Sequence, residues 1–150
     1  MGERRRTTGS FEVRRTTGSN EVVDRLFVYA TLREGQTARS LIANQITRCV
    51  KASTTGAIYV FPMGYAGLVE TPEPTRVMGE LLWLTELPAT FGLLDAYEGE
   101  DFARVLKQVT LDTGESVWSW IYVLTDPGAI KHGTLIEHGD WSRYCAERPK

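Results

Sequence analysis

The sequence has few cysteines and no long apolar run. Cys49 and Cys145 are its only two cysteines among 150 residues, and they stand far apart in the chain. No secretory hydrophobic region opens the chain, so we expect a cytoplasmic location with free thiols, although a single disulfide remains an alternative. The apolar runs at 56–61 and 80–84 are far shorter than the roughly 18 residues that a transmembrane helix needs. We therefore expect no membrane partner.

An excess of either charge is also missing. The chain has 17 Lys and Arg residues against 19 Asp and Glu residues, which gives a formal net charge of -2. This balance favours neither nucleic acid nor an anionic membrane as a partner. The length is that of one compact domain, which can bury a core without disulfides or metals. It does not distinguish a monomer from a homodimer, and both remain open.

Motifs of several common enzyme classes are absent from the sequence. It contains no glycine-rich phosphate loop, no CxxC pair, no HExxH and no GxSxG. His132 and His138 lie in a loop-like stretch without an acidic ligand at metal spacing, so we expect no metal site. Cys49 falls in a predicted strand, where we expect it to belong to the core rather than to act as a nucleophile.

The first residues of the chain contain a duplicated unit. Residues 3–11 and 12–20 match at seven of their nine positions. The Arg, Thr, Gly and Ser residues of this unit bury too little apolar surface to offset the entropy lost on ordering. We therefore predict a mobile N-terminal arm over residues 1–23 and a single domain over residues 24–150. A basic tether, a modification site or a contact with another protein are alternative roles for the arm.

Strands outnumber helices in the pattern of the remaining chain. Strands are predicted over 25–32, 46–53, 55–61, 76–84, 103–111 and 115–124. Helices are predicted over 37–45 and 88–99, and from Asp140 onward. The segment 62–74 is rich in Pro and Gly, and we expect it to be irregular and partly extended. The sequence thus predicts the α+β class, with a small mixed β-barrel or strongly curled sheet and a few flanking helices.

Four carboxylates gather at the C-terminal end of the helix predicted over 88–99. They are Asp95, Glu98, Glu100 and Asp101. A helix C-terminus carries partial negative charge, so this placement costs about a few tenths of a kcal/mol per carboxylate. Either the group is a solvated loop, or one of its members has a function.

Four stretches of the chain together resemble a known family. The first is Tyr29, Ala30, Thr31 and Leu32, followed by Arg33 and Gly35. The second comprises Leu94, Asp95, Glu98, Gly99, Phe102 and Arg104. The stretches 77–84 and 136–144 add Gly-Glu and Gly-Asp-Trp. In this order they resemble the signatures of the γ-glutamylcyclotransferase-like family, which includes the γ-glutamylamine cyclotransferases and their bacterial and plant relatives.

The resemblance implies a small mixed barrel and a reaction within one substrate molecule. The free α-amine of a γ-glutamyl group attacks its own γ-carbonyl, which releases 5-oxoproline and an amine or amino acid, and no cofactor is needed. Glu98 matches the catalytic carboxylate of the family. The loop of Tyr29, Ala30, Thr31 and Leu32 matches the loop whose N–H groups bind the substrate carboxylate, and Tyr122 matches a tyrosine beside the pocket.

The proposed proton transfer sets a requirement on Glu98. An α-amine has a pKa of about 7.7 to 8 and an ordinary Glu about 4.3, so the transfer is uphill by about 5 kcal/mol. We therefore expect the pKa of Glu98 to be raised by partial burial against the aromatic strand, by Asp95 and by the helix C-terminus. Asp95, Glu100 and Asp101 are expected to be structural or solvated. Arg104 is expected to be an ion-pair partner of a nearby carboxylate.

Two positions depart from the family pattern. Ala30 stands where the family usually has Gly, and Phe102 replaces a common Tyr. Our hypothesis is that the loop keeps a φ that alanine can adopt, because an alanine with positive φ would be strained. The alternative function is a non-catalytic module on the same fold that binds a small carboxylate. Retention of Glu98 favours the enzyme, whereas Ala30 favours the binding module.

Overall fold

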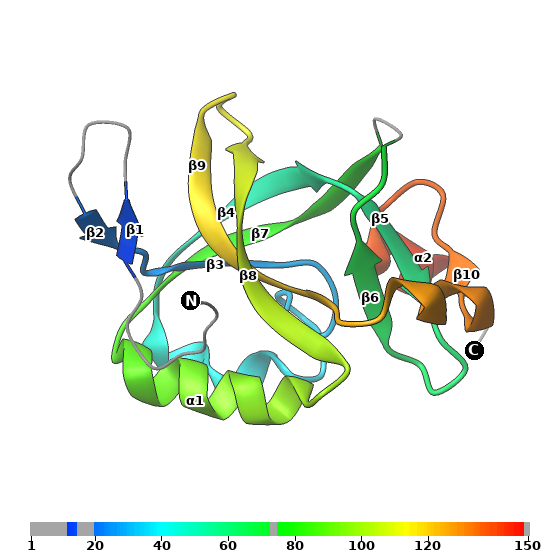
Figure 1. The fold of residues 1–150 in the computed structure, drawn as a ribbon, viewed down its shortest axis with the longest axis horizontal. Coiled ribbons are helices and arrows are strands. Elements are labelled where there is room, and N and C mark those ends of the chain that lie inside the picture. The colour runs from blue at the N-terminus through cyan, green and yellow to red at the C-terminus, as the bar shows by residue number, and fades with distance from the viewer. Residues whose placement is uncertain (1–11, 15–19, 73–74, 149–150) are drawn as a thin grey trace.

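The computed structural model describes residues 12–14, 20–72 and 75–148 (Figure 1). Its strands are β1 (Glu12–Arg14), β2 (Asn20–Val22), β3 (Arg25–Val28), β4 (Ile46–Thr55), β5 (Ala57–Val60), β6 (Ala66–Val69), β7 (Arg76–Leu84), β8 (Phe102–Leu111), β9 (Ser116–Leu124) and β10 (Thr134–Leu135). Its helices are α1 (Leu87–Glu98) and α2 (Trp141–Glu147), with short 3-10 helices η1 (Arg39–Leu41), η2 (Ala43–Gln45) and η3 (Pro127–His132).

The centre of the fold is a closed barrel with the strand order β3-β7-β4-β8-β9. Its strand pairs are antiparallel except for β3 and β9, which run parallel and pair only at Leu26 and Trp120. Helix α1 lies along one side of the barrel in Figure 1. The predicted α+β class with a small mixed barrel is confirmed.

A second sheet lies beside the barrel and has the order β10-β5-β6 (Figure 1). The segment 62–74 is partly extended, as predicted, because Ala66–Val69 in its middle forms strand β6, although no separate strand was predicted there. All four residues of β6 are buried, so the strand shows no alternation of apolar and polar side chains. The Pro and Gly residues on either side of β6 therefore determined the prediction for this segment.

Helix α1 follows the prediction closely. Pro88 lies in its first turn, where a missing N–H is harmless, and the helix ends before Gly99, which has a φ of 76°. The helix predicted over 37–45 is wrong, since this segment forms the two short helices η1 and η2. Neither has a side-chain cap, and Ile42 between them has a ψ of 10° with φ at -127°, which interrupts a continuous helix.

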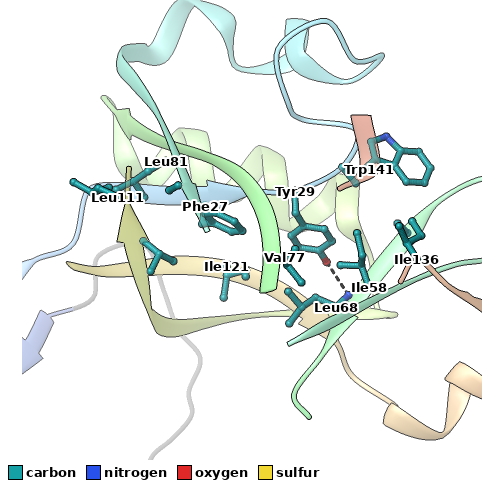
Figure 2. Close-up of a cluster of buried hydrophobic side chains, with 14 residues drawn as sticks. Phe27, Tyr29, Ile58, Leu68, Val77, Leu81, Leu111, Ile121, Ile136 and Trp141 are labelled. Carbon is teal, nitrogen blue, oxygen red and sulfur yellow. Dashed lines mark hydrogen bonds between the residues drawn. The ribbon is translucent and has the colours of Figure 1, made fainter. Parts of the chain in front are cut away.

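The barrel interior is filled by a cluster of buried side chains from several strands (Figure 2). Phe27, Leu81 and Ile121 come from β3, β7 and β9 and are at most 1% exposed. Gly79 permits the close packing of β7 on β3, because a Cβ at this position would lie 2.2 Å from the Val28 carbonyl oxygen. Any larger residue at position 79 would push these two barrel strands apart.

The segment predicted as an arm is described only in part. Most of the duplicated unit at 3–20 lies outside the described residues, but β1 and β2 form a short antiparallel pair. Val23 packs into the core with 1% exposure, and its carbonyl oxygen accepts a hydrogen bond from the Trp120 indole. Among the described residues, no helix has the length and apolar character needed to cross a membrane.

Candidate active site

A cavity of about 270 Å³ opens where β3 leaves the barrel. Strands β3 and β9 pair at only one position, and both contribute residues to the cavity wall. The lining residues are Phe27, Val28, Tyr29, Ala30, Thr31, Leu32, Tyr65, Ala66, Tyr97, Glu98, Asp101, Phe102 and Tyr122. A water molecule occupies about 30 Å³ of liquid, so the cavity suits a small metabolite.

Glu98 is the last residue of α1 and lines this cavity. Gly99 ends the helix here, which brings the carboxyl group to the cavity wall. The carboxyl group is partly buried and makes no hydrogen bond or ion pair with any residue that the structure describes. Burial first, and then the charge of Asp95, raise the pKa of Glu98 to about 7. The direction of this shift agrees with the prediction, and burial and Asp95 are two of its three predicted causes. The helix C-terminus, the third, stays a prediction.

Asp95 lies one turn before Glu98 and is held by two neighbours. Its carboxylate accepts hydrogen bonds from Arg104 Nε at 2.9 Å and Nη2 at 3.1 Å, and from the Tyr122 hydroxyl at 2.6 Å. The Arg104 guanidinium also stacks over the Phe91 ring at 4.3 Å. Arg104 is therefore an ion-pair partner, as predicted, and Asp95 has a structural role. Through these contacts α1 is fixed to β8 and β9.

Tyr122 lines the cavity, but its hydroxyl already makes a hydrogen bond within the protein. The hydroxyl donates to Asp95, and burial followed by this carboxylate raises the tyrosine pKa well above its usual value. Tyr29 is similar, because its buried hydroxyl donates to the Tyr122 carbonyl at 2.7 Å and accepts from the Leu68 N–H at 3.1 Å (Figure 2 shows the second bond). Both side chains therefore shape the cavity by their rings and fix its walls by their hydroxyls.

The chain turns sharply after β3, which ends at Val28 rather than at the predicted residue 32. The carbonyls of Ala30 and Thr31 accept hydrogen bonds from the N–H groups of Arg33 and Ala38. The N–H groups of Ala30, Thr31 and Leu32 have no acceptor within the described part of the chain. Successive free N–H groups beside a cavity can bind a small anion such as a carboxylate. The three predicted loop residues thus offer donors where the resemblance expects them.

The backbone at Ala30 is compatible with alanine. Among described residues other than glycine, only Glu86 has a positive φ. The hypothesis that the loop keeps a φ that alanine adopts is confirmed.

Buried charges hold the same loop from behind. Glu80 on β7 is 8% exposed, and its carboxylate accepts from the Glu34 N–H at 3.0 Å and from Arg39 Nη1 at 2.7 Å. Arg33 donates to Asp140 at 2.8 Å, and Asp140 caps the start of α2 as predicted. The Gly-Glu and Gly-Asp-Trp stretches therefore support the cavity from outside it.

Seven lining residues were not predicted as site residues: Phe27, Val28, Tyr65, Ala66, Tyr97, Asp101 and Phe102. The Tyr97 hydroxyl lies 3.1 Å from Thr31 Oγ1, which links the end of α1 to the loop. Asp101 is exposed, as expected of a solvated carboxylate, yet it also borders the cavity. Its place in the group of four carboxylates was the only sequence signal for it. No sequence signal indicated Tyr65, because this residue lies in the segment 62–74 that was expected to be irregular and partly extended.

A comparison with known protein families shows which family the chain belongs to. The family described as "Gamma-glutamyl cyclotransferase, AIG2-like" matches residues 26–143, which includes β3, α1 and the whole cavity. The chain belongs to this family.

Solved structures of other proteins share the cyclotransferase fold. YkqA from Bacillus subtilis superposes with a TM-score of 0.65 and 24% identity, over 81% of this chain and 40% of YkqA. An AIG2-like protein from Mus musculus has a TM-score of 0.56 and 21% identity, over 70% of this chain and 80% of its own. The uropathogenic E. coli-specific protein c4763 has a TM-score of 0.63 and 18% identity, over 84% and 98%. This cyclotransferase-family chain thus spans less than half of YkqA. No curated protein matches it significantly.

Neither cysteine nor histidine is among the described residues that line the cavity. The prediction that Cys49 belongs to the core is wrong, because this residue is exposed. Strand β4 meets β8 only at Ala52 and Ser53, so its first half lacks a neighbour on that side and stays accessible. Cys49 and Cys145 are both free thiols. Within 12–14, 20–72 and 75–148, no group of three or more His, Cys, Asp or Glu residues could hold a metal ion.

Proposed function

We propose that the protein is a γ-glutamyl cyclotransferase that releases 5-oxoproline and a free amine or amino acid. The observation that carries this proposal is the carboxyl group of Glu98, which lines the cavity without a partner among the described residues and has a pKa raised to about 7. A carboxylate with these properties is suited to move a proton near neutral pH. The family match supports cyclotransferase chemistry in general. We further propose that the enzyme works on small cytoplasmic metabolites.

In the proposed reaction the substrate spans the cavity between the β3 loop and Glu98. The N–H groups of Ala30, Thr31 and Leu32 bind the α-carboxylate. Glu98 accepts a proton from the α-ammonium, and the resulting amine attacks the γ-carbonyl carbon. The new C–N bond closes the ring of 5-oxoproline, the bond to the leaving nitrogen breaks, and Glu98 returns its proton to that nitrogen. The second proton that the attacking nitrogen loses also passes to the leaving amine, which departs as an ammonium. Tyr29 and Tyr122 form the wall that keeps the bound group in place.

The raised pKa lowers the cost of the first step. A donor with a pKa of about 7.7 to 8 and an acceptor near 7 differ by about one unit, or roughly 1.4 kcal/mol. An ordinary Glu would have to overcome about 5 kcal/mol. Because both reacting groups belong to one molecule, the remaining task of the protein is to hold them in the reactive geometry. The proposed mechanism assigns binding, proton transfer and positioning to residues of this chain alone.

The test is 5-oxoproline release from a panel of γ-glutamyl amines, peptides and amino acids. We expect turnover of at least one compound, and Glu98→Gln should lower kcat by about 10² to 10⁴-fold, the usual contribution of a general acid-base group. Glu100→Gln is the matched control, because Glu100 is an exposed carboxylate two residues away that does not line the cavity. Equal turnover by the parent and Glu98→Gln would remove Glu98 from this role.

The second candidate is a binding module that holds a small carboxylate without turning it over. The free N–H groups of the loop favour it, since they can bind an anion whether or not a reaction follows. In this case calorimetry would detect binding of 5-oxoproline or glutamate, and the whole substrate panel would give no product. Glu98→Gln would then leave the affinity for 5-oxoproline within about twofold of the parent, as expected when no buried charge pair is broken.

A further inference from the structure

A second cavity, of about 500 Å³, lies between α2 and the second sheet. Its walls come from the end of β5 and the turn after it, from η3 and β10, and from α2. They include Phe61, His132, Trp141, Tyr144, Cys145 and Arg148. The described residues that line this cavity and those that line the cavity at Glu98 are entirely different. A volume of this size is typical of a binding site for a small organic molecule.

Helix α2 contributes an aromatic wall to the second cavity. Trp141, Tyr144 and Cys145 are three or four residues apart, so they lie on one side of the helix, and Arg148 follows at its C-cap. The Trp141 and Tyr144 rings are stacked, with 5.7 Å between their centroids and 25° between their planes. Trp141 is 5% exposed, and its indole N–H donates to Gln36 at 3.0 Å. This part of the wall is therefore held in place before any ligand binds.

Phe61 forms another part of the wall. It is 6% exposed and is stacked on Tyr65 at 5.0 Å. Tyr65 lines the cavity at Glu98, so this pair of rings separates the two cavities. Gly133 permits the end of η3 to lie against Phe61, because a Cβ at this position would lie 2.9 Å from Phe61 Cε1. This close packing also fixes the position of the preceding residue, His132, at the second cavity.

The charge on the second cavity is positive. Arg148 lines it, and no Asp or Glu is among its described lining residues. The Arg148 guanidinium lies over the Tyr144 ring at 5.1 Å and donates to the Tyr144 hydroxyl, but it has no carboxylate partner in the described part of the chain. Glu147, the nearest carboxylate along the chain, pairs with Arg143 at 2.9 Å. Arg148 therefore keeps N–H donors for an anion, and His132 offers a further donor.

We propose that the second cavity is a separate binding site for a small aromatic molecule that carries an anionic group, either a carboxylate or a phosphate. Aromatic rings of a ligand pack edge to face or offset against aromatic walls, and Arg pairs with both kinds of anion. The same positive charge repels an aromatic cation, which provides specificity. The inference does not depend on the proposed function, because no residue of the cavity at Glu98 takes part in it.

The first experiment compares four probes by calorimetry: naphthoate, naphthyl phosphate, naphthylmethylamine and decalin carboxylate. We expect one or both naphthalene anions to bind, and the tighter of the two identifies the preferred anionic group. Decalin carboxylate, which lacks aromatic rings, should bind about two- to tenfold more weakly than naphthoate. The proposal is overturned if neither naphthalene anion binds, if the amine binds as tightly as they do, or if decalin carboxylate matches naphthoate.

Variants test the part played by Arg148 in binding the tighter anion. Arg148→Gln should weaken its affinity by about fivefold, and Arg148→Glu should weaken it further. Lys131→Gln is the matched control, because Lys131 is an exposed cation on η3 that does not line the cavity. It should retain the parent affinity. An unchanged affinity in Arg148→Gln, or an equal loss in Lys131→Gln, would contradict a specific contact with Arg148 and overturn the proposal.

The two cysteines report where the ligand binds. Cys145 lines the second cavity, whereas Cys49 is an exposed thiol on β4 that does not. The bound anion should slow alkylation of Cys145 by iodoacetamide and leave the rate at Cys49 unchanged, as measured by mass spectrometry of the modified peptides. Saturating 5-oxoproline should not remove this protection. Equal effects on both cysteines, or loss of protection with 5-oxoproline, would show that the anion binds elsewhere and would overturn the proposed site.

Discussion

Glu98 and Asp95 stand one helical turn apart at the end of α1, and only one of them is neutralised by the protein. Asp95 receives two hydrogen bonds from Arg104 and one from Tyr122, so its negative charge is fixed in place. Glu98 receives none from the described residues and faces the cavity. The same local sequence thus gives one carboxylate that holds the helix and a second whose proton is easily exchanged.

The pH dependence of activity follows from these two residues. Ionised Glu98 is the proposed base, and its pKa is raised to about 7, so kcat/KM should fall as the pH drops below about 7. Asp95→Asn removes the second cause of the shift, and the acidic limb should move to lower pH. The measurement is kcat/KM for one γ-glutamyl substrate from pH 5 to 9 in both proteins.

Asp95→Asn also removes charge-assisted hydrogen bonds from Arg104, so its stability must be followed in parallel. Asp95 is half-exposed, and we expect a loss of about 1–2 kcal/mol in the free energy of unfolding. An acidic limb that stays at the same pH in a folded Asp95→Asn protein would contradict the electrostatic coupling of the two carboxylates.

At the scale of elements, the Tyr29 hydroxyl joins three parts of the fold. Tyr29 follows β3, and its hydroxyl bonds to a carbonyl of β9 and to an N–H of β6. It therefore ties the barrel to the second sheet at the point where the cavity begins. The position of Tyr65 in the cavity wall depends on that of β6, because Tyr65 immediately precedes this strand.

Tyr29→Phe should lower the free energy of unfolding by about 1–3 kcal/mol, because it leaves two buried backbone groups without their partner. The measurement is chemical denaturation. Tyr59→Phe is the control, since Tyr59 lies on β5 of the same sheet and its hydroxyl has no hydrogen bond within the described part. A loss of similar size in both variants would show that the Tyr29 bridge contributes nothing of its own.

For the whole molecule, the carboxylate proposed as the base lowers stability at the pH where it would act. The folded state holds the proton of Glu98 more tightly than the unfolded state, since its pKa rises from 4.5 to about 7. The favourable contribution of the protonated form is complete below pH 4.5 and is lost as the pH rises through 7. Ionised Glu98 therefore opposes folding in neutral and alkaline solution.

Glu98→Gln should consequently be more stable than the parent at pH 8, by about 1–3 kcal/mol after allowance for partial exposure. The difference should shrink toward zero near pH 4, where the parent residue is protonated. Denaturant unfolding at a series of pH values measures both. A constant difference across this range would show that the residue does not change its charge between the folded and unfolded states as proposed.

The sequence predicts the elements whose signals are local. Pro88 and Gly99 mark the ends of α1, Asp140 marks the start of α2, and Gly114 marks the β8–β9 hairpin. The loop after β3 and Glu98 were found through the family signatures, and the structure brings them to one cavity.

The missed features depend on contacts between distant segments. Strand β6 has no alternation because it is buried on both faces. Cys49 is exposed because the first half of β4 has no pairing with β8 on its other side. Tyr65 and Asp101 become neighbours of the cavity only through the packing of the second sheet on the barrel. No pattern along the chain encodes such proximity.

The parallel contact between β3 and β9 also governs when the cavity can appear during biosynthesis. The hydrogen bond between Tyr29 and Tyr122 joins residues that are 93 positions apart. The cavity wall that contains Tyr29 is therefore synthesised long before the wall that contains Tyr122. Pairings between residues so far apart in sequence form late, because a long loop must close, with a loss of chain entropy, before the paired residues make any contact. A nascent chain that ends before β9 can build the β4–β7 ribbon and α1, yet it has no pocket in which a metabolite could be held.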